Sequence, residues 1–103
     1  MRLGKREHPE AHEELLDAAS WYDGEQLGLG EDFLDAVDAA VAQLLDWPSI
    51  AHVYSGWNRE PVVHQGTMKT FPYQILYFID DSCLVVVAYA HNRRKPGYWK
   101  DRI

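Results

Sequence analysis

The chain has 103 residues, a length that corresponds to one domain and leaves no room for a second core. Apolar residues make up 47% of the chain and charged residues 25%, a globular composition that excludes a disordered or fibrous protein. The single cysteine, Cys83, excludes an internal disulfide. We therefore expect one domain, residues 1–103, that is stabilised by its own hydrophobic core.

Charge is distributed unevenly along the chain. Residues 7–58 contain 12 acids and no Lys or Arg, so this segment has a formal charge of −12. The rest of the chain holds all 10 basic residues and four acids, a charge of +6, and the two parts give the net charge of −6. The net negative charge argues against general nucleic-acid binding, but the separation leaves a basic patch near the C-terminus as a candidate binding surface.

The sequence contains no pattern typical of export or membrane insertion. The basic segment 1–6 is followed by Glu7-His8-Pro9-Glu10 instead of the apolar run of a signal peptide. The longest apolar stretch, Leu84–Ala90, is too short to span a bilayer. We expect a cytoplasmic protein that does not contact a membrane.

Two amphipathic helices are predicted in the first half of the chain. In Pro9–Glu25, apolar residues recur at helical spacing and acids occupy the opposite face; the apolar set is Ala11, Leu15, Ala18, Ala19 and Tyr22. Gly28 and Gly30 interrupt this pattern, and a second helix follows that ends at Trp47-Pro48, with Phe33, Val37, Ala40, Val41 and Leu44 on one face. The two helices form a predicted hairpin, in which Trp21 and Tyr22 provide core or helix–sheet contacts.

The second half of the chain is predicted to form strands. His52–Asn58 is typical of a loop, Glu60–Thr67 is a candidate strand, and Phe71–Ile79 and Cys83–His91 are rich in β-branched and aromatic residues. Phe71–Ile79 is apolar on both faces, so we expect a central strand covered by the helices on one side and by the C-terminal segment or a partner on the other. With an edge strand in Arg2–Arg6, the prediction is an α+β fold of order β-α-α-β-β-β, an antiparallel sheet packed against an N-terminal helical hairpin.

The C-terminal segment is the main candidate for binding. Five basic residues and two aromatic residues lie within eleven positions after His91, a combination that contacts phosphates, stacks on bases or binds an acidic protein. The alternative is that Arg93, Arg94 and Lys95 only neutralise the acidic helices of the same chain. The candidate target-binding residues are Arg93, Arg94, Lys95, Trp99, Lys100 and Arg102.

A metal-independent nuclease is a second possibility. A histidine near Lys, Arg and Tyr side chains can move protons and stabilise the phosphorane as the 2′-hydroxyl of RNA attacks. The candidate catalytic residues are His64, Lys69, His91, Arg93 and Tyr98, although a histidine on a strand is more often a surface or hydrogen-bonded group.

No metal or other cofactor is expected. His8 and His12 have i, i+4 spacing, but the helix begins between them and no third ligand has a matching spacing. Cys83 opens an apolar strand without an activating base nearby in sequence, and we expect a buried, inert thiol. Trp57 lies in a predicted loop and has no packing role that the sequence reveals.

Five segments in order resemble the RelE/ParE toxin superfamily of bacterial type II toxin–antitoxin systems, and the resemblance extends over nearly the whole chain. They are Ala-Ala-Ser-Trp-Tyr at 18–22, Leu-Gly-Leu-Gly at 27–30 with Phe33, Asp-Trp-Pro at 46–48, Phe-Pro-Tyr at 71–73 through Tyr77, and His91–Trp99 with Arg102. The resemblance implies a compact β-α-α-β-β-β fold. It also implies a growth-inhibiting toxin that a small antitoxin neutralises by wrapping around it.

The superfamily divides by target. RelE-like members are ribosome-dependent mRNA endonucleases with several basic residues on the sheet, whereas ParE-like members lack that set and poison DNA gyrase. Here Lys69 is the only Lys or Arg between Glu60 and His91, and the −12 segment opposes binding to a polyanionic ribosome. We therefore expect a ParE-like toxin that acts on DNA gyrase. The alternatives are a RelE-like endoribonuclease, which acts on the ribosome and mRNA, and a non-toxic protein that binds an antitoxin.

Overall fold

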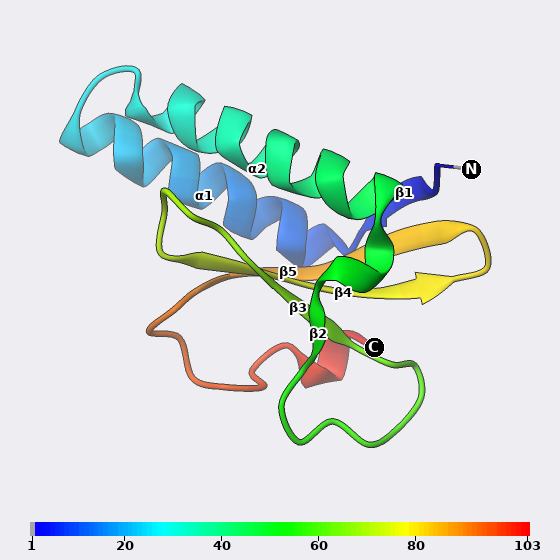
Figure 1. Cartoon of the computed structure of the whole chain (residues 1–103). Helices are drawn as coiled ribbons and strands as arrows, with labels where there is room; N and C mark the ends of the chain where they lie inside the picture. Colours follow the sequence, from blue (N-terminus) through cyan, green and yellow to red (C-terminus); the bar gives the residue numbers. More distant parts are fainter. Residues whose placement is uncertain (1) are drawn as a thin grey trace.

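Two helices cover one face of a five-stranded sheet in the computed structural model, which describes residues 2–103 (Figure 1). The elements in chain order are β1 (Gly4–Glu7), α1 (Pro9–Glu25), α2 (Leu29–Asp46), the short 3₁₀ helix η1 (Pro48–Ile50), β2 (His52–Val53), β3 (His64–Thr67), β4 (Tyr73–Asp80), β5 (Cys83–His91) and the 3₁₀ helix η2 (Lys100–Arg102). This arrangement confirms the predicted α+β fold and helical hairpin.

The sheet differs from the prediction in two details. Its order is β1-β5-β4-β3-β2, and β1 pairs parallel to β5, so the sheet is not antiparallel throughout. The two-residue strand β2 lies within the segment that we predicted to be a loop, and it pairs with β3 through His52 and Val53. Such a short strand carries no alternating pattern of its own and depends on its neighbour for its conformation.

Local signals account for the helical hairpin. Pro9 occupies the first turn of α1, where the Nδ1 atom of His8 accepts a hydrogen bond from the Glu10 amide at 3.1 Å. At the start of α2, the Asp23 carboxylate accepts hydrogen bonds from the amides of Gly28 and Gly30, at 3.2 and 2.8 Å. The helices approach closely at Gly30, where a Cβ atom would lie 2.3 Å from the carbonyl oxygen of Ala19.

The sheet is covered on both faces, as the apolar pattern of β4 predicted. Toward the helices, Ile75 and Tyr77 of β4 pack with α1, α2 and β5. On the opposite face the cover is the C-terminal segment and the β2–β3 loop. That second core consists of Val63, Leu76, Val87, Ala88, Ala90 and Trp99, with Tyr54, Trp57, Phe78 and Tyr98 packed against it.

Three predictions about single residues were wrong. Trp57 has a packing role, since its ring centroid lies 5.4 Å from that of Trp99 and its Nε1 donates to the carbonyl of Pro61 at 2.7 Å. Trp21 is 61% exposed, whereas its neighbour Tyr22 is buried as expected. Cys83 is only partly buried, since it is the first residue of β5 beside the exposed β4–β5 turn.

None of the helices within residues 2–103 combines the length and the apolar character that a membrane crossing requires.

Candidate binding loop and neighbouring pocket

The loop that follows β5 is fixed at its first residues. The amide of Asn92 donates to the carbonyl of Pro72 at 2.8 Å, and the amide of Arg94 donates to the carbonyl of His91 at 2.9 Å. The amide of Arg93 donates to Nδ1 of His91 at 3.0 Å. These bonds connect the start of the loop to β5 and to the β3–β4 connection.

The end of the loop is fixed by the carboxylate of Glu14, which comes from α1. Its Oε2 accepts from the Tyr98 hydroxyl at 2.5 Å, and its two oxygens accept from Nη1 and Nη2 of Arg102 at 2.9 and 3.1 Å. Its Oε1 also accepts from the Tyr89 amide at 3.1 Å. One carboxylate therefore joins α1, β5 and the C-terminal segment.

The Glu14 interactions also complete the open edge of β5. β1 pairs with β5 only as far as Val86, so the backbone beyond it has no neighbouring strand on that side. Glu14 accepts a hydrogen bond from the Tyr89 amide, and Arg102 donates one to the carbonyl of Val87 at 3.1 Å. These side chains satisfy backbone groups that a further strand would otherwise bind.

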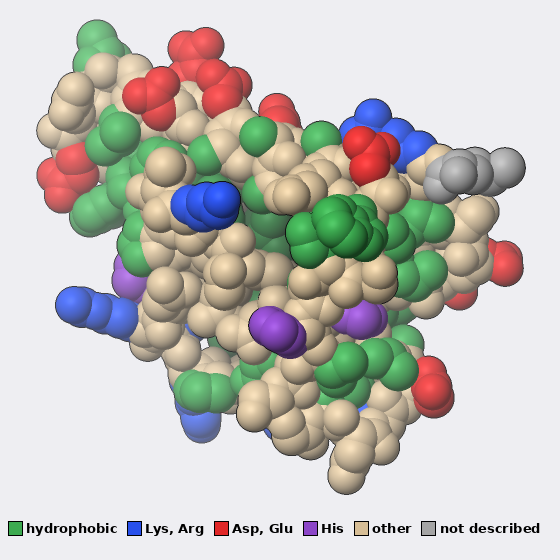
Figure 2. All heavy atoms as spheres, viewed as in Figure 1, with side chains coloured by type: hydrophobic (Ala, Val, Ile, Leu, Met, Phe, Trp, Pro, Cys, Tyr) green, Lys and Arg blue, Asp and Glu red, His purple; other side chains and the backbone are tan. Residues whose placement is uncertain are grey.

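The predicted target-binding residues fall into two groups. Trp99 is 2% exposed within the second core, and the Arg102 side chain is 10% exposed and paired with Glu10 and Glu14, so both stabilise the fold and offer little surface to a target. The side chains of Arg93, Arg94, Lys95 and Lys100 are exposed. Figure 2 shows Lys and Arg side chains around the C-terminal loop and acidic side chains over the helical hairpin.

Arg94 is ordered by an aromatic ring although it is exposed. Its guanidinium lies 3.9 Å from the centroid of the Tyr98 ring, and Tyr98 is itself held by Glu14. Burial, followed by the hydrogen bond to Glu14, raises the pKa of the Tyr98 hydroxyl above its usual value. The Tyr98 hydroxyl therefore stays protonated near neutral pH and acts here as a fixed donor.

The candidate catalytic residues do not gather at one point. His91 and Tyr98 share a pocket of about 360 Å³ between the loop and the sheet, but His64, Lys69 and Arg93 do not line it. His64 stacks on Tyr77, its partner on β4, whereas His91 pairs with Tyr73. Tyr73 and Tyr77 are four residues apart, a separation of about 13 Å along a strand.

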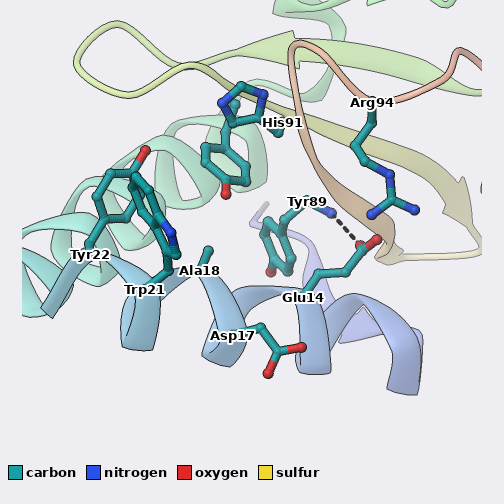
Figure 3. Close-up of a pocket in the computed structure, with 9 residues that line it drawn as sticks. Glu14, Asp17, Ala18, Trp21, Tyr22, Tyr89, His91 and Arg94 are labelled. Carbon is teal, nitrogen blue, oxygen red and sulfur yellow. Dashed lines mark hydrogen bonds between the residues drawn. The ribbon is translucent and has the colours of Figure 1, made fainter. Parts of the chain in front are cut away.

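A second pocket lies on the other side of the loop, and of its lining residues only His91 and Arg94 are among the candidates named from the sequence. It is open, has a volume of about 400 Å³ and lies between α1 and the ends of β4 and β5 (Figure 3). The residues that line it are Glu14, Asp17, Ala18, Trp21, Tyr22, Tyr73, Tyr89, His91 and Arg94. The signal available in the sequence was Trp21, which lies four residues after Asp17 and therefore on the same acidic side of α1.

The structure is that of a small α+β protein with an exposed basic loop near its C-terminus. The sequence model of the ParE toxin of the type II toxin–antitoxin system parDE matches residues 6–96. The chain therefore belongs to the ParE toxin family.

Among solved structures, the chain is similar to one described as the chromosomal ParDE TA system from P. aeruginosa. The two share 17% sequence identity with a TM-score of 0.62, over 87% of this chain and 96% of that one. At this identity the likeness shows a common fold. A comparison with curated proteins finds no match.

Proposed function

We propose that this protein is a growth-inhibiting toxin that binds DNA gyrase through the loop 92–97 and is neutralised by a cognate antitoxin. The proposal is carried by one observation: the loop that holds Arg93, Arg94 and Lys95 is fixed at both ends and presents exposed cations. A preorganised loop loses little conformational entropy on binding, which favours recognition of a protein surface.

The arrangement of the nuclease candidates favours this proposal over RNA cleavage. The face of the sheet beneath the loop is filled by Trp57 and Trp99, and the Tyr98 hydroxyl is committed to Glu14. His64 stacks on Tyr77 and His91 pairs with Tyr73, about 13 Å further along β4, so the two histidines are too far apart to share a substrate phosphate. The −12 segment would in addition repel a ribosome.

The antitoxin is proposed as the second partner. The similar solved structure is described as a ParDE toxin–antitoxin system, and this chain belongs to the ParE family. An acidic segment of an antitoxin would be attracted to the exposed Arg93, Arg94 and Lys95. Binding there would cover the same loop that we propose to contact gyrase.

A supercoiling assay with purified gyrase tests the proposal. We expect the wild-type protein to inhibit supercoiling, and the double variant Arg93→Ala/Lys95→Ala to lose at least about tenfold in potency if the loop cations contribute as interface hot spots do. Lys5→Ala, an exposed cation on β1 and remote from the loop, is the matched control and should inhibit like the wild type.

Growth and RNA measurements distinguish the alternatives. Arrested growth with intact gyrase activity and mRNA cut at ribosomes would replace the gyrase proposal with endoribonuclease activity. Normal growth on induction without an antitoxin would identify a non-toxic antitoxin-binding protein. Co-purification with the product of the adjacent small reading frame tests the antitoxin separately from the target.

A further inference from the structure

The open pocket beside α1 is walled by aromatic rings that meet at steep angles. Trp21 and Tyr22 have ring centroids 5.1 Å apart at 78°, Tyr22 and Tyr73 6.3 Å apart at 60°, and Tyr73 and His91 5.2 Å apart at 81°. Successive rings therefore turn around the pocket instead of stacking in parallel. Ala18 leaves space between them, because its side chain ends at Cβ.

Carboxylates adjoin this aromatic wall. Glu14 and Asp17 of α1 both line the pocket, and Glu14 is neutralised by Arg102. None of the salt bridges within residues 2–103 includes Asp17, so its carboxylate is available to pair with a bound cation. The surrounding helices add negative potential, since residues 7–58 contain no Lys or Arg.

The one cation of the pocket lies at its far end. In Figure 3, Arg94 is on the side of Glu14, and Trp21 and Tyr22 are on the opposite side. The Arg94 guanidinium is held over the Tyr98 ring at 3.9 Å. The end formed by the rings is therefore separated from this positive charge.

We propose that the aromatic end of this pocket binds an organic cation, an alkylammonium or guanidinium group, with Asp17 as its counter-ion. The faces of aromatic rings attract such cations, and several rings set at steep angles can surround one ammonium group. A volume of about 400 Å³ fits a small ligand or the end of one long basic side chain. The aromatic end of the pocket is separate from the loop cations proposed above to contact gyrase and the antitoxin, of which Arg94 lines only the opposite end, and the proposal does not depend on those contacts.

Calorimetric titration with a matched pair of probes tests the proposal. The first probe is Nα-acetyl-Nζ-trimethyllysine methylamide, and the second is its neutral isostere, in which carbon replaces the ammonium nitrogen. We expect the cation to bind about 3- to 30-fold more tightly than the neutral isostere, the range expected for a cation–π contribution. Equal affinity of the two probes, or no binding of either, would overturn the proposal.

Two exposed tryptophans provide matched variants. Trp21→Ala removes one wall of the pocket and should weaken binding of the cationic probe at least threefold, whereas Trp47→Ala should leave it unchanged. Trp21 is 61% exposed and Trp47 is 60% exposed, so both changes leave the buried core residues in place, and circular dichroism checks that both variants fold. Equal weakening by both variants would contradict a site at the pocket.

Asp17→Asn tests the counter-ion. We expect the substitution to lower the affinity for the cationic probe and to leave the affinity for the neutral isostere unchanged. An unchanged affinity for the cation would overturn the role of Asp17. Choline and a lysine-containing peptide then distinguish the source of the cation. Tighter binding of choline supports a free small molecule as the occupant, and tighter binding of the peptide supports a basic side chain of a partner protein.

Discussion

Glu14 of α1 and Arg102 near the C-terminus form a bidentate ion pair. Nη1 and Nη2 of the arginine lie 2.9 and 3.1 Å from the two carboxylate oxygens. The side chains are 16% and 10% exposed, so solvent screens the pair only weakly. The pair connects residues 88 positions apart in the sequence. It closes the C-terminal segment over the edge of β5 and thereby fixes the end of the binding loop.

Glu14→Gln should destabilise the protein by about 1–3 kcal/mol, because it removes the carboxylate shared by Arg102, Tyr98 and the Tyr89 amide, while Glu10 still pairs with Nε of Arg102. We expect a lower midpoint in urea denaturation with an unchanged slope. Glu13→Gln changes the adjacent residue, which is exposed, and should shift the free energy of unfolding by less than about 0.5 kcal/mol. If the two variants unfold alike, the Glu14–Arg102 pair does not stabilise the C-terminal segment.

Gly30→Ala should be strongly destabilising because α1 and α2 touch at this point. A Cβ atom would lie 2.3 Å from the Ala19 carbonyl oxygen and 2.7 Å from Cγ of Asp23. The helices must separate to accept it, which we expect to cost about 2 kcal/mol or more. Gly24→Ala is the control, since nothing lies within 4 Å of the added methyl group, and alanine should stabilise α1 there by about 0.5–1 kcal/mol. Thermal unfolding of both variants measures the difference; equal melting temperatures would show that the helices are not in close contact.

Local signals predicted much of the fold. Pro9 and the glycines at 28 and 30 mark the helix boundaries by backbone chemistry, and the strand Cys83–His91 has the predicted bounds because its whole length is β-branched, apolar or aromatic. The two-residue strand β2 was missed because only its pairing with β3 defines it. The parallel pairing of β1 was also missed, since a four-residue edge strand carries no signal for its direction.

The candidate site was predicted only in part. The run of basic residues after His91 located the exposed loop, but the same run contains Trp99 and Arg102, which the fold uses internally. Glu14 was not identified because its partners lie 75 to 88 positions away. The exposure of Trp21 in the pocket was missed because Trp21 adjoins the buried Tyr22, and periodicity does not show where the buried stripe of α1 ends.

Trp99→Ala should unfold the second core and release the loop. Trp99 packs against Tyr54 and Trp57 at ring distances of 5.0 and 5.4 Å and is almost fully buried. Loss of such a side chain costs about 3–5 kcal/mol. Hydrogen exchange should show faster exchange at the loop amides, which are held in the wild type, and Trp99→Phe should retain most of the protection. Unchanged protection in Trp99→Ala would mean that Glu14 alone holds the segment.

Tyr77 makes the fold sensitive to alkaline pH. Its hydroxyl donates to the carbonyl of Pro48 at 2.6 Å, and burial raises its pKa from 10.0 to about 12. Because the folded state keeps the phenol protonated while the unfolded chain releases the proton from pH 10 upward, this contribution to stability is complete below pH 10 and is lost between pH 10 and about 12. The free energy of unfolding should fall in that window by about 1.4 kcal/mol per pH unit for this group. Tyr77→Phe is less stable at neutral pH, since it lacks the bond to Pro48, but its stability should decline less steeply above pH 10. Urea denaturation at a series of pH values from 9 to 12 measures both slopes; parallel slopes would show that Tyr77 ionises equally in the folded and unfolded states.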